Sequence, residues 1–371
     1  MPEKRRARTV VLAVLLLAVA TACGTSATPG ANGVDTRSAS GAVGTPAGTI
    51  VELGSGLLMP MMKIWAAAYR QKVPGVTVSV NGGGSGLGIA SAMDGKADIG
   101  ASDAYLSSGD LVKAPSLLNI PLAVSAQLVI YNLPGLSQGS HVMLNGQVLA
   151  GMYDGTITRW NAPAIANLNP SLHLPDIKVV PVHRSDSSGD TFLFTSYLST
   201  QDPVWNNDHG YGTTVAWPPV SAAIAASGSS TMLADCARIP GCVAYNGISY
   251  LTQTLADGLG YAALANSAGR YTLPTPTAIQ AAVAPFVALT PPNETISLID
   301  GPAAAGYPIL NYEYAIVSTR QPDPAKASAV KAFLDWVITT GNSPTYVSQV
   351  NFRPLPPAVA ILASQQISRI G

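Results

Sequence analysis

An α/β fold is predicted by the way strand-like and helix-like segments alternate along the sequence. The strand-like segments, rich in β-branched residues, are 49–54, 76–80 and 128–133, and the helix-like segments, with apolar residues at helical spacing, are 61–71, 278–289 and 328–340. Strands that alternate with helices indicate a sheet covered by helices. Of the 371 residues, 47% are hydrophobic and 11% are charged, so the chain can fill two domain cores and lacks the composition of a disordered protein.

The first 22 residues have the pattern of a signal peptide and are expected to lie outside that fold. Four cations within positions 4–8 precede the apolar run 10–20, which is too short to cross a bilayer comfortably. The run leads into Cys23 through a stretch that resembles the lipobox of bacterial lipoproteins, with Ala20 where Leu is usual. We therefore predict that Cys23 carries a lipid anchor. The alternative is ordinary secretion after cleavage behind Ala22.

The exported chain is predicted to begin with a flexible tether and to carry little net charge. Residues 23–48 are rich in Ala, Gly, Ser, Thr and Pro, with almost nothing apolar to pack. Loss of the signal peptide removes four of the 20 basic and one of the 20 acidic residues, which leaves 16 and 19. A slightly acidic chain argues against a nucleic-acid partner, because such surfaces need clustered Lys and Arg. An anionic ligand would have to be held by local groups.

The two cysteines beyond Cys23 are predicted to form a disulfide. Cys236 and Cys242 lie in the stretch DCARIPGC, with five residues between them. Outside the cytoplasm a disulfide around Pro240 and Gly241 is favoured. The alternative is metal binding, which is disfavoured because two thiolates need two further ligands and no histidine is near in sequence.

Three polar turns, 54–60, 81–88 and 185–190, each follow a strand-like segment and open a helix-like one. The N-terminus of a helix offers unpaired N–H donors and a partial positive charge, which suit an anion. Three such termini at one edge of a sheet would bind a tetrahedral oxyanion. Each turn taken alone is also explained by an ordinary capped helix.

Motifs for catalysis, cofactors and metals do not occur in this sequence. Ser55 and Ser85 lack the glycine two residues earlier that a G-x-S-x-G elbow requires, and Lys96 is followed by Ala97, which excludes a P-loop. There is no H-E-x-x-H motif, and the four histidines are scattered. The sequence therefore predicts neither a cofactor nor a metal, and a hydrolase remains possible only through residues that cannot be paired from sequence.

Seven segments together resemble the PstS family, the substrate-binding lipoproteins of the high-affinity phosphate ABC transporter. They are GSGLLMP, GGGSGLGIASAMDGKADIGASDAYLS, VIYNLPG, LNGQVLAGMYDGTITRWNAPAI, VHRSDSSGDTFLFTSYL, ADCARIPGCVAYNGISYL and YPILNYEYAIV. They span nearly the whole chain after the tether. GASDAYLS and HRSDSSGDTF are the most specific of these segments, and their combination is similar to the 38-kDa lipid-anchored antigen branch of the family.

The resemblance implies a type II periplasmic-binding-protein fold, with two lobes and a ligand cleft between them. Lobe I would comprise 49–124 and 307–371, and lobe II 125–306, with crossing hinge segments near 122–129 and 307–314. It implies that the lobes close on inorganic phosphate and that the permease subunits of an ABC importer recognise the closed form. The receptor is expected to be a monomer, anchored on the extracytoplasmic face of the cell membrane.

The resemblance also assigns residues to the phosphate site. The side chains and main-chain groups that it places on phosphate are those of Leu58, Met59, Ser85, Asp103, Arg184, Ser188, Gly189 and Asp190. Leu58 and Met59 would act through their backbone N–H groups, and Asp186 would orient Arg184. Many members have Thr where this chain has Leu58, and the Thr hydroxyl also donates to the ligand. In this chain that hydrogen bond must come from the backbone or from another residue. Many also have Thr at Asp190, where the lipid-anchored branch shares the Asp.

Asp103 is the residue predicted to determine selectivity. A carboxylate repels an anion unless the anion carries a proton to donate, as hydrogenphosphate does and sulfate does not. Facing sulfate, Asp103 would be a buried, unpaired charge, at a cost of about 3–5 kcal/mol. Asp190 would accept a second proton or cap its helix. The alternatives are a receptor for sulfate or molybdate, which both acids disfavour, and a secreted phosphatase, which needs a base that the sequence does not reveal.

Overall fold

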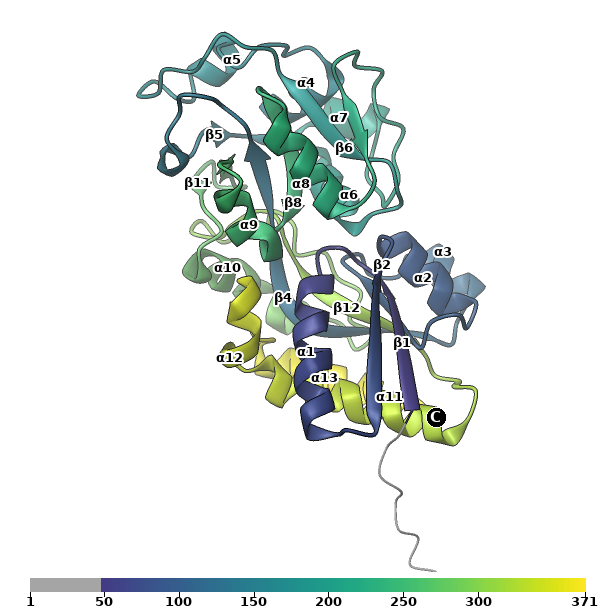
Figure 1. Cartoon of the computed structure of the whole chain (residues 1–371). Helices are drawn as coiled ribbons and strands as arrows, with labels where there is room; N and C mark the ends of the chain where they lie inside the picture. Colours follow the sequence, from purple (N-terminus) through teal and green to yellow (C-terminus); the bar gives the residue numbers. More distant parts are fainter. Residues whose placement is uncertain (1–47) are drawn as a thin grey trace, which may run out of the picture. The chain divides into compact units, whose positions relative to one another are not determined.

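The described part of the structure, a computed structural model, is residues 48–371, in which strands and helices alternate (Figure 1). The predicted signal peptide, most of the tether and the lipidation at Cys23 lie outside the described residues. In residues 48–371, no helix combines the length and the hydropathy needed to cross a bilayer. In the same range, no three His, Cys, Asp or Glu side chains are grouped so that they could hold a metal ion.

One large sheet organises the fold. Its strands are β1 (Gly48–Gly54), β2 (Val76–Gly82), β3 (Ile99–Ser102), β4 (Leu117–Tyr131), β6 (Val180–Arg184), β7 (Ile224–Ala226), β8 (Cys242–Gly247), β9 (Gly260–Tyr261) and β12 (Leu310–Ser318). Their order is β2-β1-β3-β12-β4-β8-β6-β7, and β9 pairs with β4. The strands β2, β1 and β3 are parallel to one another, as are β8, β6 and β7, while β12 and β4 in the centre pair antiparallel. A smaller sheet, β11-β10-β5, contains β5 (Met143–Leu144), β10 (Ala263–Ala265) and β11 (Tyr271–Thr272).

The long strand β4 joins the two parallel groups (Figure 1). It pairs with β12 from Leu117 to Ala126 and with β8 from Gln127 to Tyr131, and it is buried throughout. Most of its residues are apolar, as expected for a strand that is buried on both faces, and Ser125 and Gln127 are among its few polar ones. The crossing segments expected near 122–129 and 307–314 overlap β4 and β12.

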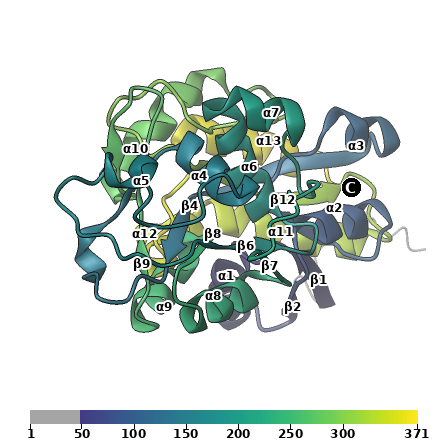
Figure 2. The same cartoon turned by 90° about the horizontal axis from the view of Figure 1, so that it is seen from above.

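Helices cover both faces of the large sheet. They are α1 (Met59–Lys72), α2 (Ser85–Met93), α3 (Ser108–Lys113), α4 (Gly146–Asp154), α5 (Pro163–Ala166), α6 (Gly189–Gln201), α7 (Pro203–Asp208), α8 (Ser229–Arg238), α9 (Leu251–Ala256), α10 (Pro276–Val283), α11 (Pro324–Ile338), α12 (Pro344–Val347) and α13 (Pro357–Ser368). Short 3₁₀ helices are η1 (Gln138–Ser140), η2 (Ile248–Tyr250), η3 (Ala284–Leu289), η4 (Thr340–Asn342) and η5 (Ser348–Val350). Seen from above, α4 and α6 lie on one side of β6 and β8, and α8 lies on the other (Figure 2).

Two helices illustrate how the sequence dictates local structure. In α1, Met61, Trp65 and Tyr69 fall on one face and are buried, as their i, i+4 and i+8 spacing predicts. The single helix expected over 278–289 is wrong in its second half, because α10 ends at Val283 and η3 follows. The cause is Pro285, which has no N–H to continue an α-helical ladder and clashes with the preceding turn.

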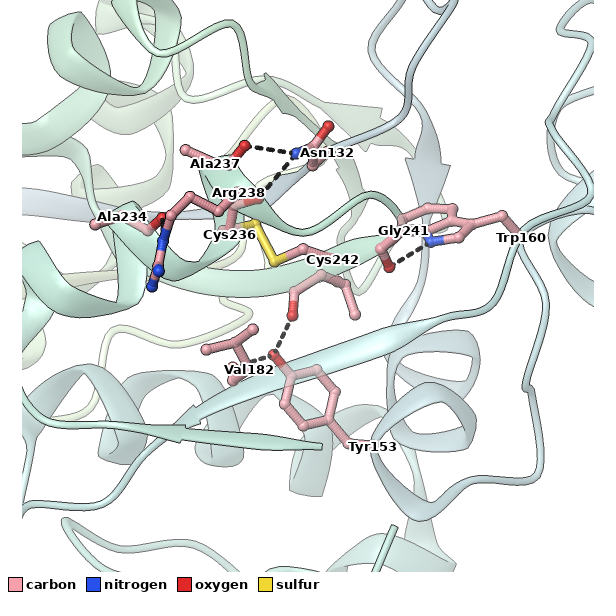
Figure 3. Close-up of a disulfide and its surroundings, with 11 residues drawn as sticks. Asn132, Tyr153, Trp160, Val182, Ala234, Cys236, Ala237, Arg238, Gly241 and Cys242 are labelled. Carbon is pink, nitrogen blue, oxygen red and sulfur yellow. Dashed lines mark hydrogen bonds between the residues drawn. A yellow bond between two sulfur atoms is a disulfide. The ribbon is translucent and has the colours of Figure 1, made fainter. Parts of the chain in front are cut away.

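A disulfide between Cys236 and Cys242 connects the last turn of α8 to the first residue of β8 (Figure 3). The two Cα atoms are 5.2 Å apart. The turn between them passes through Gly241, whose φ of +83° lies in the left-handed region that glycine adopts without strain. The side chain of Asn132 donates to the carbonyls of Cys236 and Ala237, at 3.0 and 2.9 Å, and so attaches the end of α8 to the loop after β4.

Candidate functional site

Four strand-to-helix turns meet at one place, at the N-termini of α1, α2, α6 and α8. A Cβ placed on Gly189, the first residue of α6, would lie 2.3 Å from Asp103 Oδ2 and 2.4 Å from Ser85 Oγ. A Cβ placed on Gly56, before α1, would lie 2.5 Å from the Oγ of Ser229, the first residue of α8. These approaches bring the positive ends of the four helices together.

Three of these turns contain sequence-predicted residues, and the fourth was missed. The turn before α8 has the sequence SGSS, from 227 to 230, and follows the short strand β7. Its composition has the same signal as the other three turns, a glycine and hydroxyl residues between a strand and a helix. The signal was weak because β7 has only three residues.

Asp103 lies directly after β3 and is almost completely buried. Its Oδ1 accepts a hydrogen bond from Ser55 Oγ, and its Oδ2 accepts one from Ser85 Oγ at 3.3 Å. The backbone N–H of Asp103 donates to Ser85 Oγ at 3.0 Å. Burial, reinforced by the nearby charge of Asp190, raises the pKa of Asp103 to about 6. Asp103 is therefore a hydrogen-bond acceptor at neutral pH and titrates within reach of physiological conditions.

Arg184, the last residue of β6, supplies the positive charge of the site, and its side chain is 1% exposed. Asp186 binds this guanidinium with both carboxylate oxygens, at 2.7 Å from Nε to Oδ1 and through a second bond from Nη2 to Oδ2. Burial opposes ionisation of Asp186, but the hydrogen bonds and charge of Arg184 hold its pKa below the ordinary value. A paired carboxylate of this kind fixes the plane of the guanidinium.

Asp190 lies in the first turn of α6 and contacts the same guanidinium from the other side. Its Oδ2 accepts from Arg184 Nη1 at 2.9 Å and from Ser229 Oγ at 3.0 Å. Its Oδ1 accepts from Gln127 Nε2 at 3.1 Å. Burial raises the pKa of Asp190, although Arg184 acts against this rise. The capping residue of α6 is Ser188, whose Oγ accepts from the Asp190 N–H at 3.1 Å.

At the start of α1 the main chain is held by Ser55. The N–H of Leu58 donates to Ser55 Oγ at 2.9 Å, and the N–H of Met59 donates to the Ser55 carbonyl at 3.2 Å. The Leu58 side chain is fully buried in the core. The hydroxyl that this turn offers to the site is therefore that of Ser55, which lies between Leu58 and Asp103.

The structure thus groups Ser85, Asp103, Arg184, Asp186, Ser188, Gly189 and Asp190 around one point, with Leu58 and Met59 one residue layer away through Ser55. Ser55, Gln127 and Ser229 join them without having been predicted as site residues, although Ser55 lies in one of the three predicted turns. If every acid is ionised, one guanidinium faces three carboxylates. Burial makes the charge on Asp103 and Asp190 costly, as their raised pKa values show. An oxyanion that carries its own protons can donate a hydrogen bond to these carboxylates, so the site favours such a ligand.

A cavity of about 710 Å³ opens beside these turns. Its lining includes Gly86 and Ser187, which adjoin Ser85 and Ser188, and the rings of Tyr105 and Phe192. These two rings meet edge to face with their centroids 5.4 Å apart. Tyr105 lies in the loop after β3, and Phe192 lies on α6, which follows β6. The contact therefore links the part of the fold that contains β1, β2 and β3 to the part that contains β6, β7 and β8.

Comparisons with known proteins agree on a family. A family model described as a PBP superfamily domain matches residues 39–340. The phosphate-binding protein PstS of Methanocaldococcus jannaschii is 33% identical over 347 residues, which cover 87% of each chain. The protein of the same name from Xylella fastidiosa is 30% identical over 82% of this chain and 80% of its own length.

The fold agrees with a solved structure as well. The phosphate-binding protein of Stenotrophomonas maltophilia superposes with a TM-score of 0.64 at 19% identity, over 86% of this chain and 94% of that one. At this identity the likeness concerns the fold, which is the predicted periplasmic-binding-protein architecture. The chain belongs to the PBP superfamily and, within it, to the family of PstS phosphate-binding proteins.

Proposed function

We propose that this protein is the phosphate receptor of an ABC importer and not an enzyme. The observation that carries the proposal is Asp103, a buried carboxylate held by two serine hydroxyls beside the buried Arg184. A site for a fully deprotonated anion would not place a carboxylate there, because the two charges would repel each other in a medium of low dielectric constant. The names of the relatives from Methanocaldococcus jannaschii and Xylella fastidiosa support phosphate as the ligand.

In this proposal each residue of the site has a role in saturating hydrogenphosphate. Arg184 donates the one guanidinium hydrogen that Asp186, Asp190 and Ser229 leave free. Ser188 donates its hydroxyl hydrogen, and Ser85 turns its hydroxyl hydrogen from Asp103 to the ligand. The first N–H groups of α6, beginning at Gly189, donate along the helix dipole. Asp103 accepts the proton of the ligand.

The residues next to these ligand-binding groups contribute to phosphate binding in two further ways. Asp190, which shares Arg184 with the ligand, accepts a second proton from dihydrogenphosphate, and Asp186 keeps the guanidinium in plane. Leu58 and Met59 contribute the N-terminal field of α1 and hold Ser55.

We further propose that the receptor works outside the cytoplasm, anchored by a lipid on Cys23, and passes phosphate to permease subunits. Closure of the groups containing β1–β3 and β6–β8 about β4 and β12 would enclose the ligand. Contacts that support a closed arrangement include the Ser249 hydroxyl, which donates to the Leu57 carbonyl at 2.7 Å, and the N–H of Gly86, which donates to the Ser187 carbonyl at 3.1 Å. Metabolic labelling with a palmitate analogue, compared with a Cys23→Ser variant, tests the anchor.

The decisive experiment is calorimetric titration of the exported chain, stripped of ligand, with phosphate and with sulfate. We expect tight one-to-one binding of phosphate and no binding of sulfate. In Asp103→Asn the amide donates where the carboxylate accepts, so sulfate should gain at least about a hundredfold, the equivalent of about 3 kcal/mol. Absence of phosphate binding would refute the proposal, and binding of sulfate or molybdate by the wild type would identify another oxyanion receptor. Turnover of a chromogenic phosphate ester would indicate a phosphatase.

A further inference from the structure

A second carboxyl group lies behind Asp103, on the central strand β12. Glu313 is fully buried, and it faces a β-bulge at which the register of β12 with β4 shifts between Glu313 and Tyr314. Glu313 pairs with Ala123 and Tyr314 with Pro121, so one residue of β4 is left over. Pro121 suits this position because it has no N–H to contribute to the ladder. Bulges redirect side chains, and this one accompanies the turn of Glu313 towards Asp103.

The hydrogen bonds around Glu313 contain more acceptors than hydrogens. Asn311 Nδ2 lies within 3.2 Å of three acceptors, which are the carbonyls of Asp103 and Tyr312 and Glu313 Oε1. Ser125 Oγ lies 2.7 Å from Asn311 Oδ1 and 2.5 Å from Glu313 Oε1. An amide NH₂ has two hydrogens and a hydroxyl has one, so three hydrogens face five contacts. Too few hydrogens therefore reach Glu313 Oε1 to stabilise a carboxylate charge, which favours the neutral acid.

The other oxygen of Glu313 gives a second reason for a proton. Oε2 is buried, and no N–H or O–H group of residues 48–371 donates to it. Asn311 Nδ2 contacts both Glu313 Oε1 and the Asp103 carbonyl, so the two acids are neighbours, and a proton on Oε2 can bond to the Asp103 carboxylate. Two carboxyl groups in contact share one proton, because both cannot be ionised in a buried site.

We propose that Glu313 is a positioning residue for selectivity: it is a neutral acid whose hydrogen bond to Asp103 keeps Asp103 ionised and able to accept the proton of the ligand. This inference rests on the proposed phosphate-binding function and extends it by one residue. Without the donor, Asp103 would take up a proton more readily. A protonated Asp103 donates to any oxyanion, and so it no longer rejects sulfate.

The groups around the pair favour the proton on Glu313. Burial and the charge of Asp103 raise the pKa of Glu313 well above its ordinary value, and the hydrogen bond from Glu313 acts to lower that of Asp103. Among the charged groups, Asp190 on α6 raises the pKa of Asp103 and Arg184 on β6 lowers it. The tyrosines that face the pair are Tyr314 on β12, beside Glu313, and Tyr250 on η2, beside Asp103.

The test compares Glu313→Gln with Glu313→Met by titrating phosphate and sulfate between pH 5 and pH 8. The glutamine amide copies the protonated acid, with an oxygen for Ser125 and an N–H for Asp103, so we expect selectivity and its pH profile to be unchanged. Methionine removes the donor. Sulfate affinity at neutral pH should then rise about tenfold, as expected for one lost charge-assisted hydrogen bond. The pH at which sulfate begins to bind should rise by about one pH unit.

A ligand-free measurement and a matched control separate this inference from the proposed function. The infrared difference spectrum of wild type minus Glu313→Gln at pH 7 should contain the carbonyl band of a protonated carboxylic acid. Glu294→Gln alters another buried carboxyl group, outside the site, and should leave sulfate binding unchanged. Absence of the infrared band, or an equal gain of sulfate affinity in the Gln and Met variants, would overturn the inference. A wild type that binds no phosphate but has the band would refute only the proposed function.

Discussion

At Gly189 a single missing side chain allows the first turn of α6 to approach Asp103 and Ser85. Because a Cβ there would lie within 2.4 Å of both side chains, no side chain fits unless this turn moves away. We predict that Gly189→Ala lowers phosphate affinity at least about tenfold, since a shift of the donors breaks one or two hydrogen bonds to the ligand. Isothermal titration calorimetry of the variant checks this.

The matched control for this prediction is Gly109→Ala. Gly109 also lies in a helix, α3, but a Cβ there would meet only Ser107 Oγ, at an ordinary 3.6 Å. We expect native phosphate affinity for this variant and native circular dichroism for both. Equal affinities in Gly189→Ala and wild type would mean that the contact of α6 with Asp103 is not needed for binding.

The residues of the site also explain why so much polarity is concentrated in the stretch 183–192. Ser188 caps α6, Asp186 fixes Arg184, and Asp190 binds the other side of the same guanidinium. A single buried arginine thus has two carboxylate partners within six residues of its own position. Breaking one member of such a network costs more than the network contributes, because a buried charge is left unpaired.

At the scale of elements, α8 is attached at both of its ends. Ser229 at its first residue donates to Asp190, and Cys236 near its last residue is joined to β8. Loss of the disulfide in Cys236→Ser/Cys242→Ser should lower the free energy of unfolding by about 2 kcal/mol, because the short closed loop no longer restricts the unfolded chain. Urea denaturation followed by tryptophan fluorescence measures the change.

Phosphate binding provides the control for the disulfide variant. Ser229 lies at the opposite end of α8 from the cysteines, so we expect the affinity of the folded double variant to stay within about threefold of wild type. An unchanged urea midpoint would contradict the stabilising role of the bond. A large loss of affinity with an intact fold would mean that the bond also positions Ser229.

At the scale of the whole molecule, buried acids make stability depend on pH. Burial raises the pKa of Glu52 to about 8, that of Glu294 to about 9 and that of Asp103 to about 6. The folded state therefore holds these protons more tightly than the unfolded state, in which carboxyl groups titrate near their ordinary values. Their contribution to stability is complete below about pH 4.5 and is lost as the pH rises towards 9.

We accordingly predict that the ligand-free protein melts about 5 °C or more lower at pH 9 than at pH 5. Asp186, whose pKa is lowered, acts in the opposite sense but only below its ordinary pKa, outside this window. Differential scanning calorimetry across the range tests the prediction. In Glu294→Gln the contribution of Glu294 to this pH dependence should disappear, so the melting temperature should fall less between pH 5 and pH 9. A melting temperature that rises from pH 5 to pH 9 would show that the prediction is wrong.

The sequence by itself determined the alternation of strands and helices, the strand-to-helix turns before α1, α2 and α6, and the family to which the chain belongs. These features depend on near neighbours: β-branched runs favour strands, and glycine and serine open helices. Pro285 shows the limit of periodicity, because one residue without an N–H divided a regular apolar pattern into α10 and η3.

Only the tertiary structure decided which residues share the site. Asp103, Glu313 and Ser125 meet because β12 lies between β3 and β4, an order that no local pattern encodes. Ser55 and Ser229 join them because the turns before α1 and α8 close on each other. The physical reason is that strand pairing is selected by the burial of whole faces across the sheet, so contacts between distant segments are fixed by the complete fold.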